Sequence, residues 1–379
     1  MRLVGADREQ AHAAGVERRL VSSQLTELVF APRSPIAAIE HEHDRPAREL
    51  IGERDCVAHL IRQRESRRLR AVGDARLVRD VQSGHAGGSG EREQRVAHVL
   101  AYHTAMIVVT GASGNIGRPL VHMLRAAGQS VRVLARDPAR ATKLLGPDVV
   151  VADATSADAF AGATKAFLLD HAGPELGAKA AAFAGAAKAA GVAHVVAISS
   201  GTIAMVPPTA IGGWHAELER AIEASGVAWT FLRPGNFASN ALRWAPMIRA
   251  SGRVFAAKPD GASAPIDPHD IAAVACAALT GRGHEGNTYT IMGPAAMTAR
   301  EQVAVIAAGI DRPIEVVEVS VEQARAGMVK GGMPELIANS IIDLLGRSDP
   351  QLTTTVQDVT GVAPRAFAQW VHAQRHAFA

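Results

Sequence analysis

Cysteine, aromatic residues and long apolar runs are all scarce in this sequence. Its 379 residues include two cysteines and 4% aromatic residues against 48% hydrophobic residues, so the core must be built from Val, Ile, Leu and Ala. Cys56 and Cys276 lie far apart and in no ligand-spaced cluster, which predicts no metal site and is typical of a reducing compartment. No apolar run reaches the ~20 residues that span a bilayer, and the N-terminus lacks the apolar segment of a signal peptide. We therefore expect a cytoplasmic protein.

Lysine is absent from residues 1–105, where arginine carries the basic charge and histidine is frequent. Three interpretations of this extension are open. It is a disordered tail, a small arginine-rich module that binds a partner, or a stretch outside the native protein, which would then start at Met106. The net charge of +3 is close to neutral for this length, so we expect neither nucleic acid nor a membrane as partner.

From Met106 onward, short apolar runs alternate with longer amphipathic ones. Strands are predicted at 106–109, 131–135, 149–152, 166–169, 194–198 and 228–232, and helices around 120–124, 137–145, 175–190 and 215–224. This alternation predicts an α/β fold with a doubly wound parallel sheet of Rossmann type. Beyond Pro234 the pattern loosens to a helix at 271–279, a strand at 287–291 and capping boxes at 298–301 and 320–323. We expect a small mixed lobe there, forming one wall of a substrate cleft.

A G-x-x-G-x-x-G loop lies directly between the first predicted strand and the first predicted helix. Gly111 permits the tight turn, Gly114 leaves room for a pyrophosphate, and Gly117 lets the helix pack close to the strand. Backbone N–H groups at the helix start, aided by the helix dipole, favour phosphate there. The context predicts a dinucleotide site rather than an ordinary glycine turn. The predicted cofactor contacts in the loop are Gly111, Ser113, Gly114, Asn115, Ile116 and Gly117.

The end of the second predicted strand bears on which dinucleotide is bound. An acidic residue there would hold the ribose 2′-hydroxyl of NAD, but Arg136 stands at this point, and a guanidinium suits the 2′-phosphate of NADPH. Asp137 follows at once, so a shift of one residue would exchange the two. We predict NADPH, with NADH as the alternative. Arg118 is either a second positive contact or a solvated helix residue, and Asp153 either contacts the adenine edge or lies in a surface loop.

Further segments follow the glycine loop in a fixed order. They are the strand end 198–200, the run 229–237 (WTFLRPGNF), the run 266–271 (IDPHDI) and the closing stretch 360–370. With the loop, Arg136 and Asp153, they resemble the NmrA-like group of atypical short-chain dehydrogenases/reductases over residues 106–379. The resemblance implies an NAD(P)H-binding Rossmann fold with a variable substrate lobe. Members reduce quinones, dyes or similar electron-poor acceptors, or sense the dinucleotide without turning it over.

The Tyr-x-x-x-Lys pair of classical members of this superfamily is missing. In that pair, lysine lowers the pKa of the tyrosine so that the phenol can exchange a proton. Tyr102 and Tyr289 are not followed four residues later by lysine. Alignment of the helix at 215–223 puts His215 at the lysine position and Ile211 at the tyrosine position, which excludes epimerase and alcohol dehydrogenase chemistry. His215 is the candidate catalytic residue. Otherwise it is a helix-start histidine that packs against the cofactor or is solvated.

The remaining site residues lie after predicted strands, where ligands of such sheets collect. Leu169 and Ser199 are assigned to the cofactor, with Ser199 at the nicotinamide. Asn236 and Phe237 are assigned to the substrate, and for Phe237 a place in the core is the alternative. Trp214 either stacks on a ligand or packs between elements.

The chain is expected to divide into an extension (1–105), an NAD(P)-binding core (106–235) and a substrate lobe with C-terminal helices (236–379). Two functions remain open. The first is NADPH-dependent reduction of a quinone-like or other electron-poor small molecule. The second is a non-catalytic redox sensor that acts through a protein partner. The expected partners are a small-molecule substrate and either another protein or a second copy of the chain.

Overall fold

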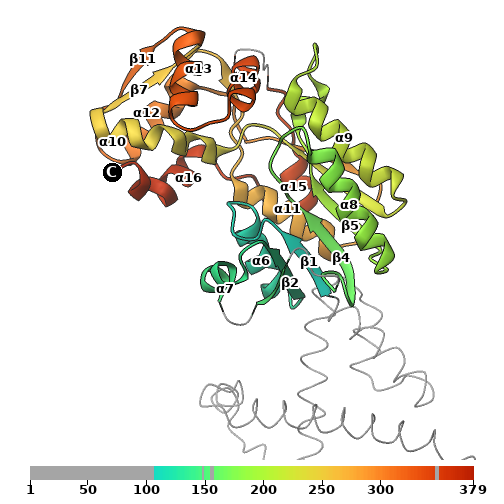
Figure 1. Ribbon diagram of the computed structural model, residues 1–379. Coiled ribbons are helices and arrows are strands. Elements are labelled where there is room, and N and C mark those ends of the chain that lie inside the picture. The colour runs from blue at the N-terminus through green and yellow to red at the C-terminus, as the bar shows by residue number, and fades with distance from the viewer. Residues whose placement is uncertain (1–105, 147–148, 154–157, 346–349) are drawn as a thin grey trace, which may run out of the picture. The chain divides into compact units, whose positions relative to one another are not determined.

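The computed structural model describes residues 106–146, 149–153, 158–345 and 350–379, which are coloured in Figure 1. The extension 1–105, with its three interpretations, lies outside the described residues, and so do Cys56 and Tyr102. Within the described ranges no helix is both long and apolar enough to cross a membrane.

Seven parallel strands form the main sheet, in the order β3-β2-β1-β4-β5-β6-β9. They are β1 (Met106–Thr110), β2 (Ser130–Ala135), β3 (Val150–Asp153), β4 (Ala163–Leu168), β5 (His194–Ile198), β6 (Ala228–Pro234) and β9 (Thr288–Ile291). Every residue of β5 is buried, because helices cover both faces of the sheet. The predicted doubly wound α/β fold is confirmed.

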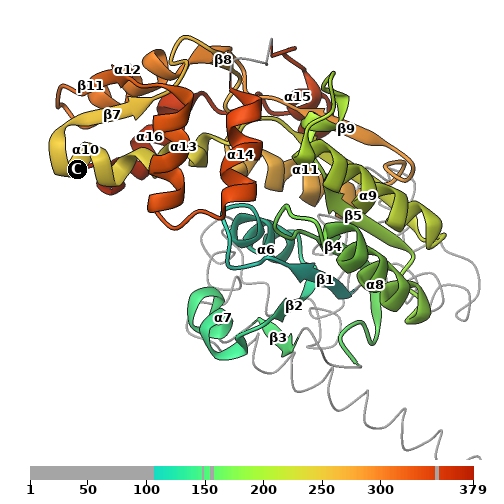
Figure 2. The ribbon, with the colours of Figure 1, turned by 45° about the horizontal axis from the view of Figure 1, so that its top comes forward.

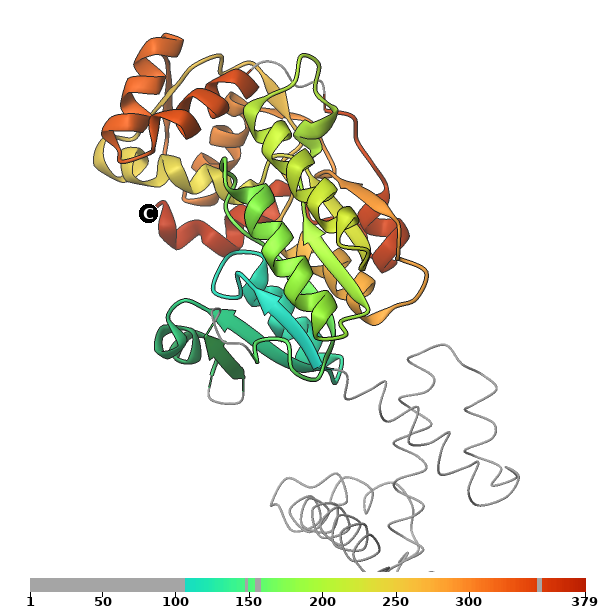
Figure 3. The ribbon, with the colours of Figure 1, turned by 45° about the vertical axis from the view of Figure 1, so that its right-hand side comes forward.

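Helices pack on the two faces of this sheet through two separate apolar clusters. Leu120 and Ile271 belong to the cluster on one face, and Ala180 and Leu218 to the cluster on the other. In Figure 3 the green helices of the second face lie in front of the strands. The first face carries α6 (Gly117–Ala126), α7 (Pro138–Leu145), α11 (Pro268–Thr280) and α15 (Thr355–Thr360), and the second α8 (Leu176–Ala189) and α9 (Ala210–Ala224).

The strand order reverses direction at β1, which lies between β2 and β4. The helices that follow β1 and β4, α6 and α8, therefore lie on opposite faces of the sheet. Doubly wound sheets bind ligands at such a switch point, at the carboxyl ends of the strands.

The later part of the chain adds a smaller lobe beside the sheet (Figure 2). Its core contains Trp244, Ile248, Ile306, Trp370 and Phe378. Two short sheets pair β7 with β11 and β8 (Ala262–Ser263) with β10 (Met297–Thr298). The other elements are η2 (Ala238–Trp244), α10 (Ala245–Ser251), β7 (Arg253–Ala256), α12 (Ala299–Gly309), β11 (Glu315–Glu318), α13 (Val321–Lys330), α14 (Glu335–Leu344), α16 (Phe367–Gln374) and η3 (Arg375–Ala377). The division at residue 235 stays a prediction, and α11 and β9 pack with the main sheet.

Local capping explains where the helices begin. Both predicted capping boxes, at 298–301 and 320–323, are present. Helix α9 starts five residues before the predicted 215, because the Thr209 hydroxyl accepts the N–H of Gly212 at 3.0 Å. Helix α11 starts at Pro268 rather than at 271, because the Asp267 carboxylate accepts the N–H of His269 at 2.9 Å. Proline suits the first helical position, since its missing N–H is not needed there.

Candidate dinucleotide site

The glycine loop joins β1 to α6 with almost no room for side chains at two of its glycines. Gly111 has a φ of +65°, and a Cβ there would lie 2.9 Å from Cδ2 of Leu169. A Cβ at Gly117 would overlap the carbonyl oxygen of Gly111. The loop therefore closes the helix onto the strand only when these positions are glycine. Leu169 lies against Gly111, close to the predicted cofactor path.

The middle of the loop is exposed and its helix start is uncapped. Ser113, Gly114 and Asn115 are exposed, whereas Ile116 is buried, so only the backbone of Ile116 could meet a ligand. No side chain caps α6, and its first turn carries no acidic residue. Such a helix start leaves N–H groups and a positive dipole end for an anion.

Thr110, which no sequence motif singles out, ties the carboxyl ends of β1 and β4 together. Its hydroxyl accepts the N–H of Leu169 at 2.8 Å and lies 3.1 Å from the carbonyl oxygen of Leu169. The bond fixes the end of β4 beside the glycine loop. The only signal in the sequence is a threonine at the end of an apolar strand.

Arg136 and Asp137 differ in what they do. Strand β2 ends at Ala135, and Asp137 is the N-cap of α7, where its Oδ1 accepts the N–H of Arg140 at 3.0 Å. Arg136 is exposed and makes no ion pair with any described residue. Asp153 ends β3 directly beside Ala135 in the strand register. The carboxylate of Asp137 is thus committed to its helix, and the guanidinium of Arg136 is available to a ligand.

Ser199 follows β5 at the same edge of the sheet and is 2% exposed. Its N–H donates to the carbonyl of Leu232 at 2.7 Å, but its hydroxyl has no hydrogen-bond partner among the described residues. A buried hydroxyl without a partner is costly. The place of Ser199 at the nicotinamide end of a dinucleotide stays a prediction.

His215 lies on the sixth position of α9 and is buried. Its Nδ1 lies 2.8 Å from the carbonyl oxygen of Ile211, so Nδ1 carries the hydrogen and donates it within the helix. Burial lowers the pKa of His215, against smaller opposing effects of Ile211 and Glu219. The ring is therefore neutral at neutral pH. The neighbouring Trp214 packs against the apolar cluster under α8 and α9.

Asn236 and Phe237 form the passage from the sheet into the lobe. The Nδ2 of Asn236 donates to Oγ of Ser263 at 3.2 Å, and its Oδ1 accepts from Asn240 at 2.8 Å. The backbone of Asn236 also accepts the N–H of Ile266 at 2.9 Å. Phe237 is half-buried against the core of the sheet. Residues of the lobe thus hold the side-chain amide of Asn236, and the ring of Phe237 contributes to the core of the sheet.

Tyr289 lies on the edge strand of the main sheet. It belongs to the start of β9, and its hydroxyl lies 2.8 Å from Nδ1 of His284 in the preceding loop. Strand β9 is separated from β1 by β4, β5 and β6. The described residues also contain no group of three His, Cys, Asp or Glu side chains that could hold a metal ion.

A glycine loop at the switch point of a parallel sheet defines a dinucleotide-binding protein of Rossmann type. Comparisons with known proteins agree. The NAD(P)H-binding family matches residues 111–282. The chain is 40% identical over 287 residues to (4-alkanoyl-5-oxo-2,5-dihydrofuran-3-yl)methyl phosphate reductase of Streptomyces griseus, which covers 72% of this chain and 99% of that protein. It is 36% identical over 283 residues to NAD(P)H azoreductase of Xenophilus azovorans, with the same coverage.

Among solved structures, the NADPH complex of the quinone oxidoreductase from Escherichia coli superposes with a TM-score of 0.63 at 25% identity, over 71% of this chain and 99% of that one. The chain therefore belongs to the NAD(P)H-binding, NmrA-like family of atypical short-chain dehydrogenases/reductases, a family of NAD(P)H-dependent reductases. The predicted family, the oxidoreductase class and NAD(P)H binding are confirmed. The roles of individual site residues stay predictions.

Proposed function

We propose that this protein transfers a hydride from NADPH to a quinone-like or other electron-poor small molecule. The observation that carries the proposal is the chemistry of α9, where Ile211 and a neutral, buried His215 stand in place of the tyrosine and lysine. At these two positions α9 offers no phenol to an alcohol or a sugar. An acceptor that needs no enzymatic proton donor fits this arrangement.

The reduced nicotinamide supplies the hydride when the cofactor is bound. A quinone accepts the hydride at one end of its conjugated system, and the resulting anion takes a proton from water. NADPH, one proton and the quinone thus give NADP⁺ and the hydroquinone. The work left to the protein is to place the acceptor beside the nicotinamide and to exclude water from the transfer.

Each residue of the site has a proposed part in this task. The glycine loop holds the pyrophosphate, Arg136 the 2′-phosphate and Asp153 the adenine edge. Ser199 and Leu169 line the nicotinamide end, while Asn236 and Phe237 border the acceptor. His215 is proposed to pack beside the cofactor and not to act as an acid, because burial lowers its pKa and the ring is neutral. The names of the relatives, a dihydrofuranone phosphate reductase and an azoreductase, support reduction as the reaction.

The test is turnover of the full chain with NADPH and a panel of benzoquinones, naphthoquinones, azo dyes and triphenylmethane dyes. We expect the absorbance of the reduced nicotinamide to fall with at least one class of acceptor. His215→Ala should lower kcat less than about tenfold, whereas loss of a general acid typically costs about 100-fold or more. Tight NADPH binding without turnover of any acceptor would reject the proposal and favour the redox sensor.

A further inference from the structure

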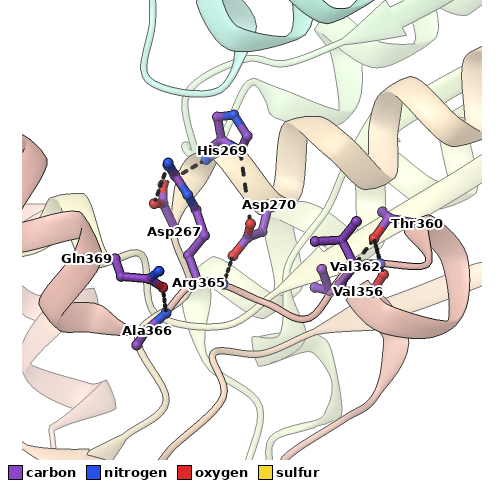
Figure 4. A network of polar contacts seen from close by, with 9 residues as sticks. All are labelled: Asp267, His269, Asp270, Val356, Thr360, Val362, Arg365, Ala366 and Gln369. Carbon is purple, nitrogen blue, oxygen red and sulfur yellow. Dashed lines mark hydrogen bonds and ion pairs between the residues drawn. The ribbon is translucent and has the colours of Figure 1, made fainter.

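The chain segment between α15 and α16 crosses from one hydrophobic core to another. Val356 of α15 is buried in the core of the sheet, and Phe367 at the start of α16 is buried in the core of the lobe. Both ends of the crossing are braced locally, as Figure 4 shows. At one end the Thr360 hydroxyl accepts the N–H of Val362 at 3.1 Å, and at the other Gln369 accepts the N–H of Ala366 at 2.8 Å.

Directly before α16, the crossing is held by two aspartates at the start of α11. The Arg365 N–H donates to Oδ2 of Asp270 at 2.7 Å, and Nη1 of Arg365 donates to Oδ2 of Asp267 at 3.2 Å. The other oxygen of Asp267 caps α11 through the N–H of His269. We call Asp267, Asp270 and Arg365 the Arg365 latch (Figure 4).

The charges of the latch make its arginine hard to replace. The side chains of Asp267 and Asp270 are 6% and 7% exposed, so both carboxyl groups have lost most of their water. His269 lies 4.0 Å from Asp270, but burial and the charge of Arg365 lower the pKa of His269, so it stays neutral. The guanidinium of Arg365 pairs with Asp267, whereas the carboxyl group of Asp270 is held by the backbone N–H of Arg365. A carboxylate left without its cation in such a place is strongly disfavoured.

The latch lies next to Asn236, which is proposed to border the acceptor. Ile266, directly before Asp267, pairs through its backbone with Asn236 at 2.9 Å and with Ala238 at 2.8 Å. The same stretch of chain therefore carries the backbone partner of Asn236 and the carboxylates that hold the lobe. The glycine loop has supports of its own, the bond between Thr110 and Leu169 and its close packing, and α6 behind it also shares an apolar cluster with α11.

We propose that the Arg365 latch sets the position of the C-terminal lobe against the sheet, and that Arg365 is a positioning residue for the acceptor and not for the dinucleotide. The inference rests on the proposed function in one respect, that the acceptor lies between the lobe and the nicotinamide. When the latch is loosened, Asn236 shifts, while the glycine loop keeps its shape. Arg365 would thus determine the KM for the acceptor without touching it.

The experiment compares Arg365→Ala, Arg365→Lys and the matched control Arg375→Ala in the full chain. Arg375 is an exposed arginine ten residues further on, at the start of η3, and its side chain bonds to His372 of α16. In Arg365→Ala we expect the acceptor KM to rise at least fivefold and the Kd for NADPH to stay within twofold. Arg365→Lys should recover part of the loss, because a lysine can still neutralise Asp267. Arg375→Ala should behave as the unmodified chain.

Hydrogen exchange separates this inference from the proposed function, because it needs no acceptor. The amides of Ala238 and Ile266 should exchange at least tenfold faster in Arg365→Ala, and those of α6 at an unchanged rate. If no acceptor is turned over, the proposed function fails and this measurement alone decides on the latch. Equal increases in the acceptor KM and the Kd for NADPH would overturn the inference. So would unchanged exchange at Ala238 and Ile266.

Discussion

At the end of β2, two neighbouring charged side chains have different surroundings, and the choice of cofactor depends on which of them faces the ribose. Asp137 caps α7, so its carboxylate is already engaged by an N–H group. Arg136 is exposed and makes no ion pair with a described residue. A free guanidinium beside the ribose favours the 2′-phosphate, since charge-assisted bonds to phosphate are about twice as strong as neutral ones.

Replacement of Arg136 by alanine should therefore separate the two cofactors. We expect Arg136→Ala to weaken NADPH binding about 30-fold, which corresponds to about 2 kcal/mol for a lost charged hydrogen bond, and to change NADH binding less than threefold. Arg140→Ala is the matched control, because Arg140 is exposed on α7 and engages Asp137 only through its backbone. The measurement is the fluorescence of the bound reduced nicotinamide. Equal losses for the two cofactors would show that Arg136 does not read the 2′-phosphate.

The contact between β1 and α6 depends on Gly117, because a side chain at this position would have no room. A Cβ at Gly117 would overlap the Gly111 carbonyl and lie 2.6 Å from the Cα of Ala112. Both neighbours are backbone atoms, so the helix itself would have to move. The phosphate site is formed by the first turn of that helix, and its displacement would open the site.

Gly117→Ala should abolish measurable dinucleotide binding, by a factor of 100 or more, and lower the melting temperature. Gly185→Ala is its control, since Gly185 is an exposed residue within α8 and a Cβ there would meet no atom within 4 Å. There the substitution should stabilise the protein by up to about 1 kcal/mol, because alanine is the better helix former. Calorimetry and NADPH titration measure both effects. A Gly117→Ala protein that binds NADPH normally would contradict the packing argument.

The stability of the whole molecule should depend on pH through groups remote from the site. His194 is 2% exposed at the start of β5, and its Nε2 lies 2.9 Å from the Thr230 hydroxyl. That hydroxyl donates to the carbonyl of His284, so Nε2 carries the hydrogen of a neutral ring. Burial, followed by the charge of Lys165, lowers the pKa of His194 to about 4, while Glu285 acts in the opposite direction.

Between pH 6.5 and 4 the unfolded chain binds a proton at His194 that the folded protein does not bind. Stability from this group is therefore lost as the pH falls through that window, by an amount of about 3 kcal/mol. His194→Gln keeps a donor for Thr230 and removes the titration, so its free energy of unfolding should fall less from pH 7 to pH 4. Urea unfolding at each pH measures the difference. Parallel curves for the two proteins would refute the assignment.

Asp270 makes the stability of the protein depend on pH in the opposite direction. Burial raises its pKa to about 6, with a further rise from Asp267, while the N–H and the charge of Arg365 lower it. Between pH 3.8 and 6 the folded protein therefore keeps a proton that the unfolded chain releases, and this contribution to stability declines as the pH rises. Because Asp270 is present in both proteins, it cancels when His194→Gln is compared with the unmodified chain.

The sequence alone determined the class of this protein. Alternating apolar and amphipathic segments and three spaced glycines depend on short stretches of chain, because strand and helix periodicity and a tight turn are local properties. The capping boxes at 298–301 and 320–323 were predictable for the same reason. The start of α9 was missed because two glycines follow its cap, and the start of α11 because the cap Asp267 was not recognised.

Only the tertiary structure decided which polar groups are free and which are engaged. The sequence could not separate Arg136 from Asp137, since the difference is a helix cap that depends on where β2 ends. It could not show that the Ser199 hydroxyl lacks a partner among the described residues or that the hydrogen of His215 is donated to Ile211. Nor could it bring Arg365 to Asp267 and Asp270, which are more than ninety residues away along the chain. Burial and long-range contact set these properties, because the charge and hydrogen-bonding state of a side chain depends on neighbours that only the fold supplies.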